Sequence, residues 1–374
     1  MSARIAAVHA PRSTRRIPEV RLALLGTGTV GTAVLHRLAA LQDEGHGAVL
    51  SLCYAGNSRF AARSADGLCP RTMTGLATRP VPGGEPPALA RIDDALCGQA
   101  PRIVLDATAS DAVAAQHAGW LSRGIHVVTA CKLGQGTSLQ RWRAINAASQ
   151  SAGSHYGDSA TVGAGLPLLR SIRDLRAGGD RIHAVAGVLS GSLAWLFNHY
   201  DGKRPFSGFV RDARDAGYTE PDPREDLSGE DVRRKLLILA RAAGVELEAD
   251  AVEVGSLVPP DLAQVEADEL DTRLEALDRP LRERFAEAYR RGEKLRFIAR
   301  LQDGRARVGL ESLADDHPLC GGTGTDNRLA IWSDRYGTQP LVIQGPGAGA
   351  GVTAAALLDD ALRIAAQSGA ISTR

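Results

Sequence analysis

Seven acidic side chains and one lysine make residues 215–244 the part of the sequence best suited to chemistry. The acids fill a proline-rich segment and the start of the predicted helix that follows it. In that helix Asp231 and Lys235 stand four residues apart, so they lie on one face. A carboxylate and an ammonium beside buried surface could bind a zwitterionic substrate or move a proton. A solvated surface pair worth about 0.2–0.5 kcal/mol would have the same spacing, so both interpretations stay open.

The helix that must position this pair is predicted over residues 228–244. Ser228 is its candidate N-cap, and Gly244 is its candidate C-terminal stop. Asp231 and Lys235 flank an apolar stripe, so the helix would hold them at the edge of a core. The stripe consists of Val232, Leu236, Leu239 and Ala243.

A glycine-rich turn near the amino terminus is the second candidate site. The short apolar run 20–25 predicts a strand, a G-x-G-x-x-G turn follows over 26–31, and residues 32–42 have a helical pattern. In this context the glycines let the backbone approach the pyrophosphate of a dinucleotide at a helix N-terminus. An ordinary strand–helix turn is the alternative. The candidate cofactor contacts are Gly26, Gly28, Thr29, Val30 and Gly31.

The end of the second predicted strand, residues 49–55, indicates which dinucleotide is preferred. Sites for NAD usually place a carboxylate there, about 20 residues after the glycines, to bind the ribose 2′-hydroxyl. This chain has Gly-Asn-Ser-Arg at 56–59 instead. Because Arg59 could bind a 2′-phosphate, NADP(H) is favoured and NAD(H) remains possible. Arg59 could also simply cap a loop.

Strands and helices alternate from residue 102 to residue 153, which predicts a doubly wound parallel sheet. Ligands bind beyond the carboxyl ends of such strands, and this places Thr108 and Lys132 near the cofactor. Lys132 could equally be a surface lysine. The predicted strands are 103–108 and 125–130, and the predicted helices are 110–124 and 137–153, capped by Ser110 and Thr137.

Cys131, beside Lys132, suggests a rival chemistry in which a thiolate attacks the substrate. A lone cysteine is more often a small buried hydrophobic residue, and no motif places a histidine to activate it. We therefore interpret Cys131 as structural.

The second half of the chain has the pattern of a mixed α/β unit. A glycine-rich turn before the last helix predicts that the chain finally returns to the dinucleotide-binding domain. The predicted elements are a small-residue turn at 163–165, a strand–turn–helix over 183–200, charge-rich helical segments over 261–293, a hairpin around Asp303 and Gly304, strands at 329–336 and 340–344, and a helix over 352–367.

Composition restricts the class of protein. With 374 residues the chain is long enough for two domains, and its net charge of +1 gives no reason to expect nucleic acid or a membrane surface as partner. Five scattered cysteines without a C-x-x-C pair fit a reducing compartment. No apolar run reaches the 18 residues of a membrane span. Residues 1–19 are predicted to be a disordered basic extension, with an organelle-targeting peptide as the alternative.

Taken together, these motifs resemble homoserine dehydrogenase. The segment GYTEPDPREDLSGEDVRRKLLILAR, residues 217–241, is similar to that family's motif nearly end to end. GTGTVG, HVVTACK, ATVGAGLP, GVLSGSLAW and SDRY…LVIQGPGAGAGVTAA support it in collinear order over residues 20–374. The resemblance is closest to the short forms, so neither an aspartokinase segment nor an ACT-type regulatory module is expected.

The resemblance implies a role for each matching position. Lys235 would be the proton donor and Lys132 the second lysine at the reacting centre. Glu220, Asp226 and Asp231 would form the substrate-binding acidic cluster. Thr108, Lys132 and Gly349 would join the glycine-rich turn in binding the dinucleotide. The carbonyls of a Na⁺ or K⁺ site would come from Ser159, Val162, Ala164 and Leu166.

The resemblance also implies an activity and an organisation. The activity is the NAD(P)H-dependent interconversion of L-aspartate 4-semialdehyde and L-homoserine, in the branch leading to threonine, methionine and isoleucine. The expected protein is a cytoplasmic homodimer. It would have a Rossmann-type dinucleotide-binding domain over 20–158, an α+β substrate and dimerisation domain over 159–339, and a return to the first domain over 340–374. The alternatives are a Cys131-dependent phosphorylating semialdehyde dehydrogenase and a non-catalytic NADPH-binding regulator.

Two positions depart from the family pattern. Many relatives have Asn where this chain has Cys131, beside Lys132. Several have Glu where Ser159 stands. The first substitution changes the polarity predicted for the cofactor pocket. The second weakens the cation site if a side-chain carboxylate helps to hold the ion.

Overall fold

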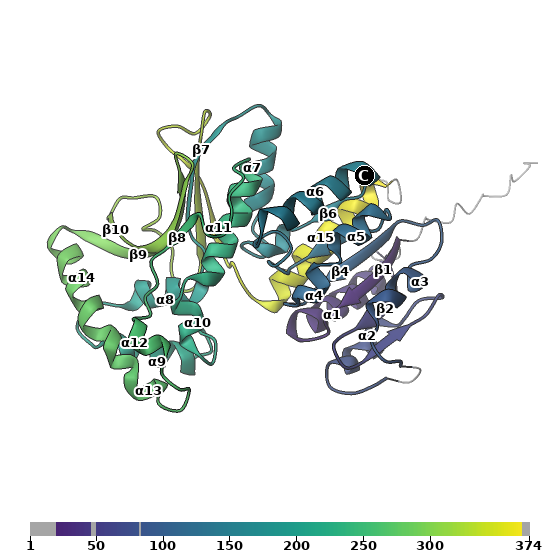
Figure 1. The fold of residues 1–374 in the computed structure, drawn as a ribbon, viewed down its shortest axis with the longest axis horizontal. Coiled ribbons are helices and arrows are strands. Elements are labelled where there is room, and N and C mark those ends of the chain that lie inside the picture. Colours follow the sequence, from purple (N-terminus) through teal and green to yellow (C-terminus); the bar gives the residue numbers. More distant parts are fainter. Residues whose placement is uncertain (1–19, 46–49, 82–83, 369–374) are drawn as a thin grey trace, which may run out of the picture.

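A computed structural model describes residues 20–45, 50–81 and 84–368 of the chain, in which two six-stranded sheets form the framework (Figure 1). The predicted basic extension, residues 1–19, lies outside the described residues. In the first sheet the strand order is β3-β2-β1-β4-β5-β6, and all neighbours are parallel except β2 and β3. The doubly wound sheet predicted from the sequence is confirmed. Its strands are β1 (Val20–Leu25), β2 (Leu50–Gly56), β3 (Ala61–Arg63), β4 (Arg102–Asp106), β5 (His126–Thr129) and β6 (Tyr156–Gly157).

Helices cover the first sheet, and the last helix of the chain is one of them (Figure 1). Ala350–Gln367 (α15) packs against Thr29–Asp43 (α1), and buried leucines and alanines of both helices share one core with β1 and β2. The predicted cap Ser110 is confirmed, because its hydroxyl accepts a hydrogen bond from the Val113 N–H. The other helices of this part are α2 (Pro70–Met73), α3 (Ile92–Ala95), α4 (Asp111–Ala114), α5 (His117–Ser122) and α6 (Leu139–Ala152).

One predicted cap in this part is wrong. Ser138, not Thr137, caps α6 and accepts the Arg141 N–H. The Thr137 hydroxyl instead donates to the Leu133 carbonyl, so it closes the loop before the helix.

The second sheet has the order β12-β11-β7-β9-β10-β8. Its neighbours are antiparallel except for β10 and β8. The predicted hairpin is confirmed, since Asp303 and Gly304 have φ values of 51° and 73° between paired β9 and β10. The strands are β7 (Ile182–Val188), β8 (Val252–Val254), β9 (Glu293–Gln302), β10 (Arg305–Ala314), β11 (Asn327–Ser333) and β12 (Leu341–Gly345).

One predicted domain boundary shifts. Because β12 pairs with β11 in the second sheet, the chain returns to the first sheet only after Gly345, and not from residue 340. The boundary was misplaced because a short strand before a glycine-rich turn looks the same in sequence whichever sheet it joins.

The second sheet buries one face against helices, including the helix that carries Asp231 and Lys235. That helix, α11, runs over Glu230–Ala242, and Val232, Leu236 and Leu239 are buried as predicted. Its N-cap is Gly229, not Ser228. Gly229 has a left-handed φ of 79°, which favours glycine, and a side chain there would collide with the Phe297 ring. The remaining helices are α7 (Leu168–Ala177), α8 (Gly191–His199), α9 (Phe206–Asp215), α10 (Pro223–Leu227), α12 (Pro260–Ala263), α13 (Leu270–Arg273) and α14 (Asp278–Arg290).

Among the described residues, no helix combines the length and the apolar character that crossing a bilayer requires.

A buried histidine predicts acid sensitivity of the first-sheet domain. The His126 ring stacks on His155, and Nδ1 accepts the His155 N–H at 2.9 Å. Burial, together with the neighbouring His155 and Arg102, lowers the pKa of His126 to about 4. The unfolded state therefore binds a proton more readily than the folded state does. As the pH falls from 6.5 towards 4, the free energy of unfolding decreases, by on the order of 2 kcal/mol at pH 5. Urea unfolding at a series of pH values should show a smaller loss in His126→Asn.

The exposed His36 on α1 offers a matched control for this measurement. His36→Asn should keep the wild-type pH dependence of the free energy of unfolding. An unchanged pH dependence in His126→Asn would show that other groups cause the acid sensitivity.

Candidate active site

Two lysines from different domains share one carboxylate. Lys235 Nζ lies 2.8 Å from Asp231 Oδ2, and Lys132 Nζ lies 3.2 Å from Asp231 Oδ1. The Lys235 side chain is only 13% exposed, whereas that of Lys132 is 31% exposed. The structure thus brings Lys132 and Lys235, separated by 103 residues in the sequence, to one point at the junction of the two domains.

Secondary structure explains how this cluster is positioned. Asp231 lies in the first turn of α11, where a carboxylate is favoured by the helix dipole, and Lys235 follows one turn later. The Lys235 ammonium also donates to the Leu189 carbonyl at 2.7 Å, just after β7. Lys132 comes directly after β5, at the carboxyl edge of the first sheet. That edge also carries the glycine-rich turn after β1.

The charges of the cluster are complementary. Burial opposes ionisation of the Asp231 carboxyl, but the ammonium groups of Lys235 and Lys132 outweigh it and hold its pKa well below the usual range. Asp231 is therefore a carboxylate at neutral pH. One negative charge between two ammonium groups leaves the cluster with an excess positive charge, which suits a substrate carboxylate or an oxygen that becomes negative.

The acidic segment before α11 is organised by Asp226. One Asp226 oxygen accepts the Ser192 hydroxyl at 2.6 Å, and the other accepts the Glu220 backbone N–H at 2.8 Å. Ser192 in turn contacts the hydroxyl of Ser190, the N-cap of α8. Asp226 thus ties the exposed Glu220 to the helix that follows β7, and both of its oxygens already have partners within the chain.

The glycine-rich turn has the geometry of a dinucleotide site. A Cβ on Gly31 would lie 1.8 Å from the Gly26 carbonyl oxygen, and a Cβ on Gly26 would lie 2.6 Å from the Ala107 carbonyl oxygen. Beside Gly28 there is open space, so the backbone can be approached there. A cavity of about 570 Å³ opens at this turn, and its walls include Gly26, Gly28, Asn57, Ser58, Thr108 and Val113.

Other predicted cofactor residues are not among the wall residues of this cavity. Arg59 donates to the Ala77 carbonyl at 3.0 Å and lies over the Phe60 ring. Thr29 and Val30 begin α1. Gly349, with φ of 120°, occupies the N-cap position of α15, which has no side-chain cap. The N-termini of α1 and α15 therefore both present unbonded backbone N–H groups, which favour an anionic ligand.

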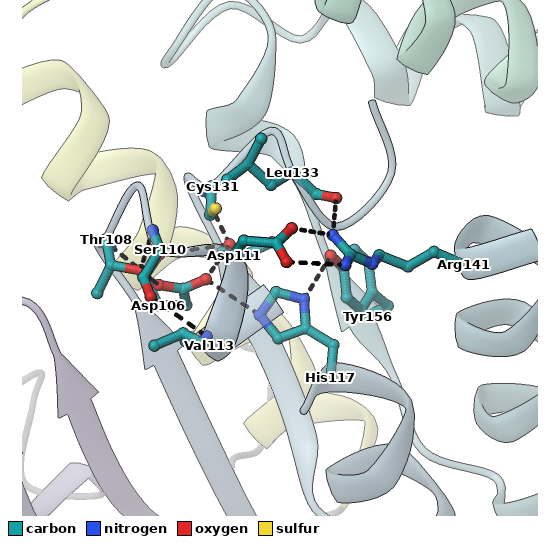
Figure 2. Close-up of polar contacts among 11 residues, drawn as sticks. Asp106, Thr108, Ser110, Asp111, Val113, His117, Cys131, Leu133, Arg141 and Tyr156 are labelled. Atoms are coloured by element: carbon teal, nitrogen blue, oxygen red, sulfur yellow. Dashed lines mark hydrogen bonds and ion pairs between the residues drawn. The ribbon is translucent and has the colours of Figure 1, made fainter. Parts of the chain in front are cut away.

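A buried hydrogen-bond network lies beneath the site (Figure 2). One oxygen of Asp106 accepts the Thr108 N–H at 2.9 Å and the Thr108 hydroxyl at 2.7 Å. The other oxygen lies 3.0 Å from His117 Nε2 and accepts the Thr129 hydroxyl at 3.1 Å. His117 Nδ1 is 3.0 Å from the Tyr156 hydroxyl. Asp106 thus fixes Thr108 at the cavity wall.

The same network fixes the backbone that leads to Lys132. The Thr129 hydroxyl oxygen accepts the Cys131 N–H at 2.8 Å. Sequence reasoning missed Asp106, His117 and Tyr156 because they are scattered over 51 residues without a motif. One signal of this network was visible in the sequence, because Asp106 is a charged residue in a predicted buried strand.

Cys131 is a poor nucleophile in this setting. It is 2% exposed, and burial with the nearby Asp106 raises its pKa to about 11. The thiol is therefore neutral at physiological pH, which favours the structural interpretation over the rival thiolate chemistry.

The segment predicted to hold a cation has unusual backbone geometry. Ala164, at φ 48°, is one of two described non-glycine residues with positive φ, and Gly163 before it is also left-handed. The buried Asp360 carboxylate accepts the Ser159 N–H at 3.0 Å and its hydroxyl at 2.9 Å. Burial raises the pKa of Asp360. In the described part of the chain no group of three or more His, Cys, Asp or Glu could hold a metal, so a cation here would depend on carbonyls such as those of Val162 and Leu166.

Comparisons with known proteins agree with this geometry. The family model for homoserine dehydrogenase matches residues 167–362, and the model for its NAD-binding domain matches residues 26–157. Homoserine dehydrogenase of Saccharomyces cerevisiae is 34% identical over 362 residues, covering 92% of this chain and 98% of the yeast protein. The solved structure of a hyperthermophilic archaeal homoserine dehydrogenase in complex with NADPH superposes with a TM-score of 0.72 at 18% identity, covering 93% of this chain and 98% of that one.

Longer relatives also match. Bifunctional aspartokinase/homoserine dehydrogenase 2 of Escherichia coli is 45% identical over 264 residues, covering 70% of this chain and 33% of that protein. The chain thus spans about a third of the length of the bifunctional relatives it matches. Since two family models and a full-length relative agree with the site geometry, the chain belongs to the homoserine dehydrogenase family, whose members are NAD(P)-dependent oxidoreductases acting on CH–OH groups.

Proposed function

We propose that the chain interconverts L-aspartate 4-semialdehyde and L-homoserine with NADP(H). The observation that carries this proposal is the Lys132–Asp231–Lys235 cluster, which stands where the carboxyl edge of a dinucleotide-binding sheet meets a second domain. Reduction of an aldehyde needs an acid at the carbonyl oxygen and a hydride donor at the carbon. When bound, the nicotinamide supplies that hydride.

Lys235 is the proton donor in this proposal. Two of its three N–H groups are used by the Leu189 carbonyl and the Asp231 carboxylate, which fix the direction of the amine. The third can donate to the substrate oxygen as negative charge develops there. In the reverse direction the same amine, once neutral, accepts the proton of the alcohol.

The two ends of the substrate would be bound by opposite charges. The Lys132 ammonium is the more exposed lysine and would bind the substrate carboxylate. The exposed Glu220 would bind the substrate ammonium. Asp226 would position Glu220 through its backbone N–H, and Asp231 would hold both lysine amines in place.

The assay is the oxidation of L-homoserine with NADP⁺, followed at 340 nm. We expect NADPH to form with L-homoserine and not with L-serine, whose hydroxyl is one carbon closer to the charged groups. Activity should not require phosphate and should survive a thiol-alkylating agent, because Cys131 is buried and neutral. Absence of turnover with either dinucleotide would reject the proposed reaction.

Arg59 provides the test of cofactor preference. Arg59 directly follows Ser58, a wall residue of the cavity, and no carboxylate follows β2 to bind a ribose 2′-hydroxyl. A charge-assisted bond to the 2′-phosphate contributes about 1.5–3 kcal/mol, so Arg59→Ala should lower kcat/KM for NADPH about 10- to 100-fold. The value for NADH should stay the same.

The control is Arg37→Ala, which removes an exposed arginine of α1 and should change neither value. Equal losses with both cofactors in Arg59→Ala would assign Arg59 a structural role in its loop.

The cation, the oligomeric state and the compartment complete the proposal. Na⁺ or K⁺ would be held by the carbonyls of Ser159, Val162, Ala164 and Leu166, with the left-handed backbone at Ala164 as support. A homodimer would form through the second-sheet face that carries the partly buried Trp332, and sedimentation equilibrium tests this. No disulfide joins the described cysteines, which suits a cytoplasmic enzyme.

A further inference from the structure

A buried arginine joins the two domains at the far end of α11. Arg241 is 2% exposed, and no carboxylate within the described residues accepts a bond from it. Nη1 donates to the Gln135 carbonyl at 2.5 Å, and Nη2 donates to the carbonyls of Thr137 and Leu247 at 2.7 and 2.8 Å. Two of these acceptors belong to the first-sheet domain, in the segment that directly follows Lys132. We call residues 132–138 the Lys132 loop.

The Lys132 loop is packed tightly against α11. The Gly136 N–H donates to the Lys132 carbonyl at 2.7 Å, which closes the loop on itself. A Cβ on Gly136 would lie 2.7 Å from the Lys132 carbonyl oxygen and 3.0 Å from the Arg234 carbonyl oxygen, so glycine suits this close approach of the loop to the helix. Just beyond the loop, the Leu139 N–H donates to Glu248 Oε2 at 3.0 Å.

The opposite side of the loop rests on the buried network of the first-sheet domain. A Cβ on Gly134 would lie 2.4 Å from the Tyr156 hydroxyl and 2.9 Å from His117 Nδ1. The loop therefore has no room to move towards the first sheet. Its position is set by that network on one side and by α11 with Arg241 on the other.

One rigid helix consequently contacts the Lys132 region at two points. At its start, Asp231 binds the Lys132 amine. Near its end, Arg241 binds the backbone of the Lys132 loop. Lys235 lies between these points, six residues before Arg241 and so about 9 Å from it along the helix axis. A helix does not stretch, so fixing both points fixes the separation of the two amines.

We infer that Arg241 is a positioning residue, which holds the Lys132 loop on α11 and thereby sets the Lys132 ammonium relative to the Lys235 ammonium. This inference deepens the proposed function and rests on it. A guanidinium suits the role because its planar fork directs several N–H groups at separate carbonyls. A lysine at this place could bond to fewer of them.

The test uses Arg241→Lys and Arg241→Ala in the full chain. A misplacement of about 1 Å can cost about 10²-fold in rate, so we expect kcat to fall about 10-fold in Arg241→Lys and about 10²-fold in Arg241→Ala. The dissociation constant for NADPH should change less than about twofold, since the glycine-rich turn is untouched. Guanidinium at millimolar concentration should restore part of the lost kcat in Arg241→Ala.

Arg143→Ala is the matched control. It removes an exposed ion pair with Glu246 across the same junction, without touching the Lys132 loop. We expect its kcat and its thermal midpoint to stay close to those of the wild type. A loss of kcat in Arg143→Ala equal to that in Arg241→Lys would show that the junction as a whole, and not Arg241, sets the rate.

Amide hydrogen exchange gives a readout that does not depend on turnover. Exchange over residues 133–139 should rise at least about 10-fold in Arg241→Lys and stay unchanged in Arg143→Ala. Wild-type kcat in Arg241→Lys, or an unchanged exchange rate in this loop, would overturn the inference, even if the thermal midpoint falls. A wild-type chain without turnover on homoserine would reject the proposed function, and the exchange measurement would still decide whether Arg241 holds the loop.

Discussion

Replacing Lys235 with alanine is expected to lower kcat by about 10²–10⁴-fold while the affinity for NADPH stays nearly unchanged. The amine is held by the Leu189 carbonyl and by Asp231, and its side chain is only 13% exposed. A water molecule therefore cannot easily take its place as a proton donor aimed at the substrate oxygen. Without it, negative charge would develop on the substrate oxygen with no donor in place. The measurement combines steady-state kinetics with a fluorescence titration of NADPH.

The control for this prediction is Lys203→Ala, which removes a lysine that is 84% exposed. Its kinetics should match those of the wild type. If Lys235→Ala turned over at the wild-type rate, Lys235 would have no part in proton transfer, and Lys132 would become the candidate acid.

Replacing Asp231 with asparagine should have the second largest effect. Lys132 and Lys235 would then face each other across a neutral amide, whose single acceptor oxygen replaces the two carboxylate oxygens that now bind one lysine each. Because Asp231 holds both amines in place, its loss would misplace them, and kcat/KM for homoserine should fall about 10²–10³-fold. The proposed function gives both lysines a part in substrate binding and catalysis, so KM should rise and kcat should fall together.

Glu230→Gln is the matched control at the start of the same helix. Glu230 pairs with Arg233 and contacts neither lysine, so its loss should leave kcat/KM within about twofold of the wild type. A wild-type KM in Asp231→Asn, combined with a lower kcat, would argue that Asp231 positions Lys235 and does not help to bind the substrate.

Local sequence patterns predicted much of the fold. The strand–turn–helix around Gly26 and Gly31, the hairpin at Asp303–Gly304 and the buried stripe of α11 each follow from contacts within a few residues. The i,i+4 spacing also predicted that Asp231 and Lys235 share one face. It could not predict that Lys132 would join them, because that requires the two domains to be placed relative to each other.

The features that the sequence did not reveal all depend on tertiary packing. The N-cap of α11 moved from Ser228 to Gly229 because the Phe297 ring lies against that turn. Asp106 and His117 form a buried side-chain contact, and such a contact produces no periodic pattern in the sequence. Arg241 looks like one more arginine of a charged helix until the Lys132 loop is placed against it.

The packing of α15 against α1 has a consequence for biosynthesis. The helix after the first glycine-rich turn emerges early from the ribosome, yet the apolar surface that covers it, including Leu357 and Leu358, is made last. The nucleotide-binding half is therefore begun first and finished only after the substrate-binding half has been synthesised. In a nascent chain stalled before residue 350, the apolar surface of α1 would stay exposed and could be bound by chaperones. Premature termination there should yield a fragment that aggregates, and not a small cofactor-binding protein.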